Sequence, residues 1–119
     1  MLFKKSVETK VNINTPLVTV YAVSNKKILG RITCIISKGA KEITISDIEC
    51  EKKNKGYGSL MMKSLIEFAR QNGFAYISGW LSKVDCDHVE RLYHFYQKFG
   101  FEIIPNKDGI KFADIKLIL

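Results

Sequence analysis

The sequence predicts a mixed α+β fold, in which a mostly antiparallel sheet carries two main helices on its faces. Three observations predict it. The first half of the chain is a series of β-like apolar runs separated by short turns, which is typical of an antiparallel meander. Two amphipathic stretches follow, at residues 57–72 and 87–99, and a glycine comes directly after each. β-like runs lie between and after these stretches, so the predicted order is ββββαβαββ.

Four strands are expected before the first helix. They lie, in chain order, at residues 2–13 (the weakest pattern), Leu17–Val23, Ile28–Ser37 and Glu42–Cys50. The segment Ser24–Lys27 has the composition of a hairpin turn, and Gly39–Lys41 turns the chain again.

The fourth strand contains a phase slip. Ile43 and Ile45 share one face, and period two would put the next apolar residue at position 47. The apolar residue comes one step later, at Ile48, which predicts a β-bulge. The other interpretation is a half-exposed strand in which Ile48 lies on the opposite face.

The first helix is expected from Tyr57 to the glycine at position 73, and a buried strand follows at Phe74–Leu81. The second helix opens at Asp87, with Glu90 as a capping-box variant. The remaining elements are a strand at Phe101–Ile104, a turn at Pro105–Gly109 and a last strand at Ile110–Leu119.

Length and composition predict one domain over residues 1–119. A chain of 119 residues buries roughly two-thirds of its unfolded surface, so it needs no disulfide or metal to fold. Cys34, Cys50 and Cys86 are an odd number without a CxxC pair, which favours a reducing cytoplasm over a disulfide framework or a zinc site. No signal peptide is expected, and no apolar run approaches the ~20 residues of a membrane span.

The formal net charge of +7 bears on partners rather than on fold. Most lysines are scattered, and one dense cluster lies at Lys52, Lys53 and Lys55. A solvated basic face explains this distribution, and so does attraction for an anionic ligand. A nucleic-acid surface is the poorer explanation, because the chain has no long arginine-rich stretch with interleaved aromatic residues.

The basic turn from Lys52 to Ser59 (KKNKGYGS) lies between a predicted strand and a predicted helix. Gly56 and Gly58 let backbone N–H groups approach a ligand closely. The first N–H groups of the helix have no internal partners, and the helix dipole puts about half a positive charge there. These features predict a site for phosphates, with a purely structural turn as the alternative. Neither a Walker loop nor a dinucleotide fingerprint fits the spacing.

Two segments carry a resemblance to a known family. The run Ile48–Met61 (IECEKKNKGYGSLM) resembles the acetyl-CoA motif of the GNAT superfamily of N-acetyltransferases, Gln/Arg-x-x-Gly-x-Gly/Ala, which follows a bulged strand. The run Leu92–Glu102 (LYHFYQKFGFE) is similar to that superfamily's tyrosine and Gly-Phe segment on the last helix. One strand separates the two segments, as the family requires, and the resemblance covers residues 17–119.

The resemblance implies a GNAT-like fold with acetyl-CoA as cosubstrate. The residues that it places at the cofactor are Ile48, Glu49, Cys50, Lys53, Asn54, Lys55, Gly56, Tyr57, Gly58 and Ser59. Lys53 stands where the family prefers Gln or Arg, and Val89 where many members have Asn. The two helices that usually shape the acceptor pocket are absent, because residues 2–24 have no helical period.

By resemblance the protein is an N-acetyltransferase that acts by direct attack of an amine. The amine would belong to a small molecule, a protein N-terminus or a lysine. Tyr96 matches the tyrosine that protonates the departing thiolate in many members. Glu49 and Asp47, at the predicted bulge, are the candidates for the base. Both carboxylates also fit exposed strand residues paired with lysines, and Tyr96 also fits a packed core position.

Two functions of other classes stay open at this point. The missing helices and the changes at Lys53 and Val89 are compatible with a CoA-binding module without catalysis. The net charge is compatible with a nucleic-acid-binding protein. A second subunit of a homodimer could complete the reduced acceptor pocket. Neither a metal site nor a membrane partner is expected.

Overall fold

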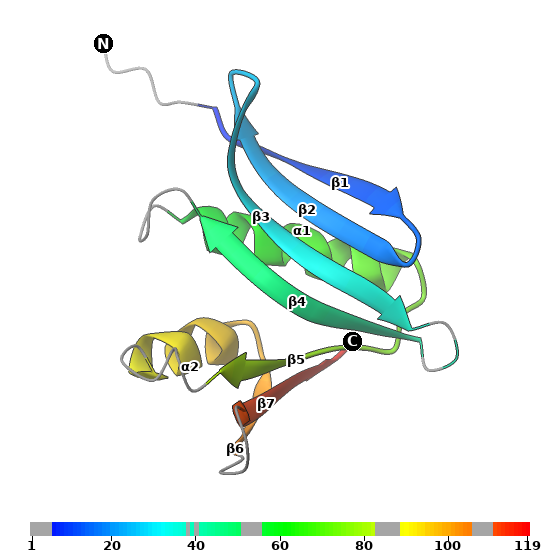
Figure 1. Ribbon diagram of the computed structural model, residues 1–119, viewed down its shortest axis with the longest axis vertical. Coiled ribbons are helices and arrows are strands. Elements are labelled where there is room, and N and C mark those ends of the chain that lie inside the picture. The colour runs from blue at the N-terminus through cyan, green and yellow to red at the C-terminus, as the bar shows by residue number, and fades with distance from the viewer. Residues whose placement is uncertain (1–5, 38, 40, 51–55, 83–88, 106–110) are drawn as a thin grey trace.

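The computed structural model describes residues 6–37, 39, 41–50, 56–82, 89–105 and 111–119 of the chain. Within them, helices and strands follow the predicted order ββββαβαββ (Figure 1). Their bounds are β1 Glu8–Asn14, β2 Leu17–Ser24, β3 Lys27–Ser37, β4 Glu42–Cys50, α1 Tyr57–Gln71, β5 Tyr76–Ser82, α2 Val89–Lys98, β6 Glu102–Pro105 and β7 Lys111–Ile118.

One sheet contains the strands of the described residues, in the order β1-β2-β3-β4-β5-β7-β6. Neighbouring strands are antiparallel except β4 and β5, which are parallel. A parallel pair needs a crossover connection, and α1 lies within the one between β4 and β5. The predicted α+β class with a mostly antiparallel sheet is confirmed.

Short turns join the first three strands. Thr15 and Pro16, linked by a cis peptide bond, connect β1 to β2. Asn25 and Lys26 connect β2 to β3 with φ angles of 50° and 66°, as in a type I′ hairpin turn. Turns of this length leave no room for a helix between β1 and β2, so the predicted absence of such helices is confirmed.

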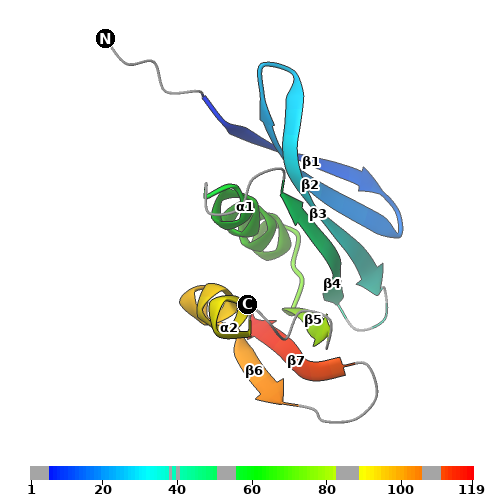
Figure 2. The same cartoon turned by 60° about the vertical axis from the view of Figure 1, so that its left-hand side comes forward.

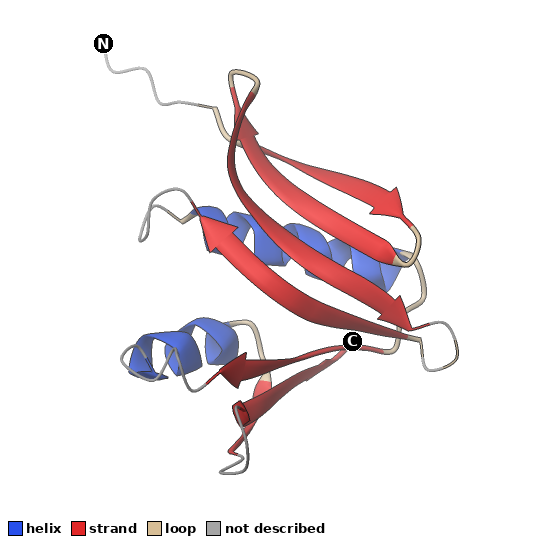
Figure 3. Cartoon of the chain, in the orientation of Figure 1, coloured by secondary structure: helices blue, strands red, loops and turns tan. Residues whose placement is uncertain are grey.

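Both helices lie on the same side of the sheet (Figure 2). Alternate residues of β2 show the two faces: Val18, Val20 and Ala22 are buried under α1, whereas Thr19 and Tyr21 point the other way and are partly exposed. No helix in the described part of the chain covers that second face, here called the open face (Figure 3). The sequence predicted two main helices on the sheet, and the structure places both on one face, because the connections of the meander are too short to hold a helix on the other.

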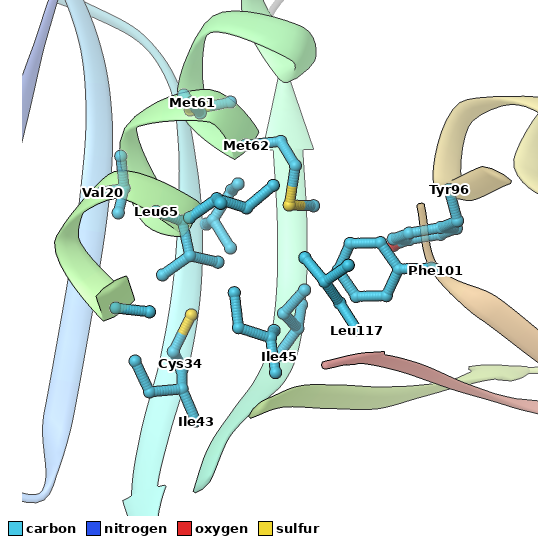
Figure 4. Packing of buried hydrophobic residues seen from close by; sticks show 14 of the residues in the cluster. Val20, Cys34, Ile43, Ile45, Met61, Met62, Leu65, Tyr96, Phe101 and Leu117 are labelled. Atoms are coloured by element: carbon cyan, nitrogen blue, oxygen red, sulfur yellow. The ribbon is translucent and has the colours of Figure 1, made fainter. Parts of the chain in front are cut away.

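The core fills the space between the helices and the sheet (Figure 4). The buried residues of α1 recur at helical spacing: Met61, Met62, Leu65, Ile66 and Ala69. Full burial of a side chain such as Leu or Ile stabilises the fold by about 1.5–3 kcal/mol. Cys34 of β3 belongs to this core, and burial raises the pKa of its thiol to about 12. It is therefore a small apolar residue at neutral pH.

Both helices end as the sequence predicted, at Gly73 and Gly100. Each glycine has positive φ, 75° and 92° respectively. Behind them, the N–H groups of Phe74 and Phe101 donate back to the carbonyls of Ala69 and Tyr96. This is the Schellman pattern, which satisfies the last carbonyls of a helix. The segment Leu92–Glu102, which carries the second part of the family resemblance, therefore leads from α2 directly into β6.

Candidate functional site

β4 and β5 are hydrogen-bonded neighbours for only part of their length. The pairing covers Glu42–Thr44 of β4 and Tyr76–Ser78 of β5. Both strands continue beyond it and diverge, to Cys50 and to Ser82 (Figure 1). We call this region the strand divergence. Past Thr44, the edge of β4 that faces β5 has no strand partner in the described residues, so its backbone groups are open to a ligand.

The predicted bulge lies where the divergence begins. Cys34 of β3 pairs with Ile45, and Thr33 pairs with Asp47, so Ser46 is an extra residue in β4. The pairing register thus confirms the phase slip that the sequence showed. Bulges of this kind redirect side chains at sites next to a ligand.

The bulge changes which residues of β4 face the helices. After it, Ile48 and Cys50 are half-buried against the core, whereas Asp47 and Glu49 are exposed on the open face. The predicted carboxylates are therefore brought together at the strand divergence. They lie on the side of the sheet that no described helix covers.

Glu49 forms an ion pair that the sequence did not reveal. Arg31 of β3 lies directly opposite it in the antiparallel register. Both Nε and Nη2 of Arg31 lie 2.8 Å from Oε2 of Glu49, and each side chain is about half exposed. The sequence also fitted a lysine partner for this carboxylate, and in the structure an arginine takes that place.

Asp47 is in a different electrostatic environment from Glu49. Desolvation raises the pKa of its carboxyl most, and the hydrogen bond and charge of Glu49 raise it further. The backbone near Ile48 and the charge of Arg31 act in the opposite direction. A carboxyl with a raised pKa is a stronger proton acceptor than an ordinary aspartate.

Cys50 ends β4 on the helix side. Burial raises the pKa of its thiol, so the neutral form is favoured at neutral pH. Its Sγ lies 3.9 Å from the position that a Cβ on Gly58 would occupy. Cys50 thus packs beside the start of α1 as a small apolar residue.

The start of α1 is the described part of the predicted phosphate turn. Gly56 precedes the helix with φ 81°, a left-handed conformation that favours glycine. Among the described residues no side chain caps the helix, and its first turn holds no acidic residue. The first N–H groups, at Tyr57, Gly58 and Ser59, have no partner within the helix itself, and the positive end of the helix dipole lies there. Lys53, Asn54 and Lys55, the other predicted cofactor residues, lie outside the described residues.

A groove runs between α1 and α2, and Ser59, in the first turn of α1, lies at one end of it. Nζ of Lys98, from the end of α2, donates a hydrogen bond of 2.8 Å to Oγ of Ser59. The groove has a volume of about 710 Å³ and is lined by Ser59, Lys63, Ile66, Glu67, Arg70, Gln71, Lys98 and Phe99. Three cationic side chains against one carboxylate give it a positive character.

Tyr96 reaches from α2 into the core and is 5% exposed. Its ring makes edge contacts with Phe95 and Phe101, at centroid distances of 5.2 and 5.4 Å. Figure 4 shows Tyr96 and Phe101 side by side, next to Leu117. The structure therefore places Tyr96 on the helix side of the sheet, whereas Asp47 and Glu49 lie on the open face.

Two residues that sequence reasoning missed belong to this site. Arg31 was read only as part of a strand, because nothing in a local pattern says which residue of β4 lies opposite it. Lys98 was one more cation at the end of a helix, and its contact with Ser59 depends on how α2 packs beside α1. Val89, which stands where many family members have Asn, is the first residue of α2.

The described residues hold neither a metal-binding group nor a helix able to span a membrane. They contain no group of three or more His, Cys, Asp and Glu side chains placed to hold a metal ion. None of the helices formed by these residues has the length and apolarity to cross a membrane.

Comparison with protein families gives one match. The model of the Acetyltransferase (GNAT) family matches residues 4–101. Among curated proteins, the uncharacterized protein YocC of Bacillus subtilis (strain 168) is 34% identical over 90 residues, which are 72% of this chain and 54% of that protein. The chain thus spans about half the length of this relative.

Solved structures share the fold at low sequence identity. A Bacillus subtilis acetyltransferase in complex with CoA gives a TM-score of 0.72 at 15% identity, over 96% of this chain and 99% of that one. The PaiA N-acetyltransferase of Thermoplasma acidophilum, in complex with coenzyme A, gives 0.71 at 16% identity, over 87% and 62%. The ribosomal-protein-S18-alanine N-acetyltransferase of Escherichia coli gives 0.69 at 16% identity, over 89% and 71%.

Proposed function

The chain belongs to the GNAT family of acetyltransferases, and from this premise we propose that it moves an acetyl group from acetyl-CoA to an amine by direct attack. The observation that carries the proposal is the strand divergence with its bulge. It would give two ligands access to the same stretch of β4 from opposite faces of the sheet, because β4 has no described strand partner on that edge past Thr44. The cofactor would approach from the helix side and the amine from the open face.

Cofactor binding is supported at the start of α1. Phosphate oxygens of the pyrophosphate would accept hydrogen bonds from the N–H groups that follow Gly56, where the helix dipole also favours negative charge. Lys53, Asn54 and Lys55 would add charge and donors to this turn. The pantetheine arm would then extend along Ile48, Glu49 and Cys50, whose backbone lies at the divergence.

The groove between the helices supports a place for the nucleotide end of CoA. It begins at Ser59, next to the proposed pyrophosphate position, and it presents Lys63, Arg70 and Lys98. Cationic side chains suit the 3′-phosphate of CoA, since hydrogen bonds between charged partners are stronger than neutral ones.

The reaction needs charge stabilisation at the thioester. As the amine nitrogen bonds to the carbonyl carbon, negative charge develops on the oxygen. N–H groups of β4 beyond Thr44, which no described strand engages on that edge, are positioned to stabilise it. Collapse then breaks the C–S bond and releases the thiolate of CoA.

Two protons must also move. A lysine-like amine with pKa ~10.4 costs roughly 4–5 kcal/mol to deprotonate at pH 7, from ~1.36 kcal/mol per pH unit. Asp47 or Glu49 would take this proton on the open face. On the helix side, the phenol of Tyr96 would protonate the thiolate. Proton acceptor and proton donor would thus lie on opposite sides of the sheet, one near the entering amine and the other near the leaving thiolate.

A CoA-binding module without catalysis is the second candidate. The two-residue connection between β1 and β2 favours it, because no helix covers the acceptor side in the described residues. A second subunit that covers the open face could supply the missing acceptor side. The mass of the protein in solution would show whether such a dimer forms.

The test is a turnover assay with acetyl-CoA and a panel of small amines, peptides with free N-termini and lysine peptides. Thiol release and the mass of the acetylated product are both measured. We expect acetylation of at least one class, and a fall of about 10²–10⁴-fold in kcat for Tyr96→Phe. Tyr21→Phe, on the open face of β2, is the matched control. Tight CoA binding without turnover on the whole panel would select the binding module.

A further inference from the structure

We propose that Asp47 is the proton acceptor of the reaction and that Arg31 assigns it this role by holding Glu49 as a charged neighbour. The inference rests on the proposed acetyl transfer. It distinguishes two carboxylates that lie two positions apart on the same face of β4, and it gives Arg31 a function as a positioning residue.

The geometry separates the two carboxylates. Arg31 and Glu49 are direct cross-strand partners, and two N–H groups of the guanidinium point at the same oxygen, Oε2, at 2.8 Å each. A carboxylate bound in this way keeps its orientation. Glu49 would have to give up these bonds, or share them, before it took a proton from a substrate.

Asp47 has no such guanidinium clamp. Across the sheet it pairs with Thr33, a neutral residue, and in the described residues Arg31 forms its ion pair with Glu49 and not with Asp47. Asp47 also lies at the bulge, where β4 turns away from β5, and is therefore nearer to the proposed thioester position than Glu49 is along the strand.

The titratable groups near Asp47 fit a proton acceptor. They are Glu49 on its own strand and Arg31 on β3. Tyr21 on β2 and Lys10 on β1 lie further away, in the row of the sheet that begins with Glu49 and Arg31. Desolvation and Glu49 raise the pKa of Asp47, and Arg31 moderates the rise. An ionised Glu49 also accepts a hydrogen bond from Asp47 once Asp47 is protonated, which stabilises the product of proton transfer.

Asp47 takes one proton from the substrate ammonium group, and the lone pair that this frees forms the N–C bond to the thioester carbonyl carbon. The C–S bond then breaks, and the CoA thiolate leaves with the phenol proton of Tyr96. The surplus N–H proton leaves to water, from which Tyr96 is reprotonated. Glu49 accepts a hydrogen bond from the new O–H group of Asp47, and Arg31 keeps both of its N–H donors on Glu49. The proton later leaves Asp47 to water on the exposed face.

The first measurement is the pH dependence of kcat/KM. Asp47→Asn should lower kcat/KM by about 10²–10⁴-fold and abolish the acidic limb of the profile. Glu49→Gln should lower kcat/KM by less than about tenfold. It should also move the acidic limb to lower pH, because Asp47 loses a negative neighbour. Arg31→Gln should move the limb to higher pH, and Arg31→Lys should restore it in part, since lysine keeps the charge without the fork of donors. Glu8→Gln, on β1, is the control for a distant carboxylate.

The second measurement needs no turnover. A 13C NMR titration of the Asp47 carboxyl carbon in the free protein should show its pKa fall in Glu49→Gln and rise in Arg31→Gln. If these pKa shifts occur but no amine is ever acetylated, the proposed acetyl transfer is wrong, whereas the effect of Arg31 and Glu49 on Asp47 is confirmed. If amines are acetylated while Glu49→Gln is as damaging as Asp47→Asn, or while Arg31→Gln leaves profile and titration unchanged, the inference is overturned.

Discussion

Gly30 of β3 shows how closely the chain is packed behind the proposed site. A Cβ at this position would lie 2.8 Å from the backbone oxygen of Glu49 and 3.0 Å from Cε of Met61. The first distance is to backbone, which cannot turn away as a long side chain can. Only glycine therefore lets the end of β4 lie at this distance from β3.

We expect Gly30→Ala to destabilise the protein by about 1–3 kcal/mol, the usual cost of overpacking a core. The substitution would also displace Glu49 and Cys50, so CoA affinity should fall. Urea unfolding measures the first effect and calorimetry with CoA the second.

Gly39→Ala is the matched control, because a Cβ at Gly39 meets nothing within 4 Å. Its effect should stay within about 0.5 kcal/mol, as for most surface substitutions. Equal urea midpoints for the two variants would show that β3 and β4 adjust without strain.

At the scale of elements, the packing of α2 beside α1 joins the two segments that carry the family resemblance. Lys98 bonds to Ser59, and its Nζ also lies 5.5 Å and 5.1 Å from the ring centroids of Phe95 and Phe99. One side chain thus links the end of α2 to the first turn of α1, at the mouth of the groove.

We expect Lys98→Met to weaken binding of CoA about 10- to 150-fold, because a hydrogen bond with a charged partner contributes about 1.5–3 kcal/mol. Binding of dephospho-CoA, which lacks the 3′-phosphate, should weaken less. Calorimetry with both ligands measures the difference.

Lys116→Met is the control, since Lys116 lies on the open face with its Nζ 4.3 Å from the ring centroid of Tyr76. An equal loss for CoA and dephospho-CoA in Lys98→Met would remove the 3′-phosphate from the groove and leave Lys98 as a link between helices.

At the scale of the whole molecule, the proposed function assigns the two faces of the sheet to two substrates. Trp80, the one tryptophan of the chain, lies on the open face of β5 and is 41% exposed. Trp80 comes after the residues of β5 that pair with β4, so it lies at the strand divergence. On its other side it pairs with Asp114 of β7. Its fluorescence is therefore an internal reporter of the acceptor side.

We expect an acceptor amine to change the emission of Trp80 more than CoA does. The double variant Trp80→Phe, Phe99→Trp moves the reporter to the groove between the helices and should reverse the order. Titration of both proteins with both ligands checks this. The assignment of faces is wrong if the amine affects only the reporter at position 99.

The sequence predicts the elements well because each depends on local chemistry. Apolar periods, Gly73 and Gly100 mark the helices, and the late arrival of Ile48 reveals the bulge. Relations between distant segments leave no such local pattern. That Arg31 lies opposite Glu49 follows from strand register, and that Lys98 reaches Ser59 follows from helix packing. The short pairing of β4 with β5, which opens the site, is likewise a property of the assembled sheet.

Ser46 is the residue of β4 that the bulge accommodates, because Ile45 and Asp47 pair with consecutive residues of β3. Side chains in a strand alternate with a period of two. If Ser46 took part in that alternation without a bulge, Asp47 and Glu49 would occupy core positions, and Ile48 and Cys50 would lie on the open face. Since the bulge absorbs the extra residue, loss of Ser46 should remove the bulge and leave the later residues of β4 on the faces that they now occupy.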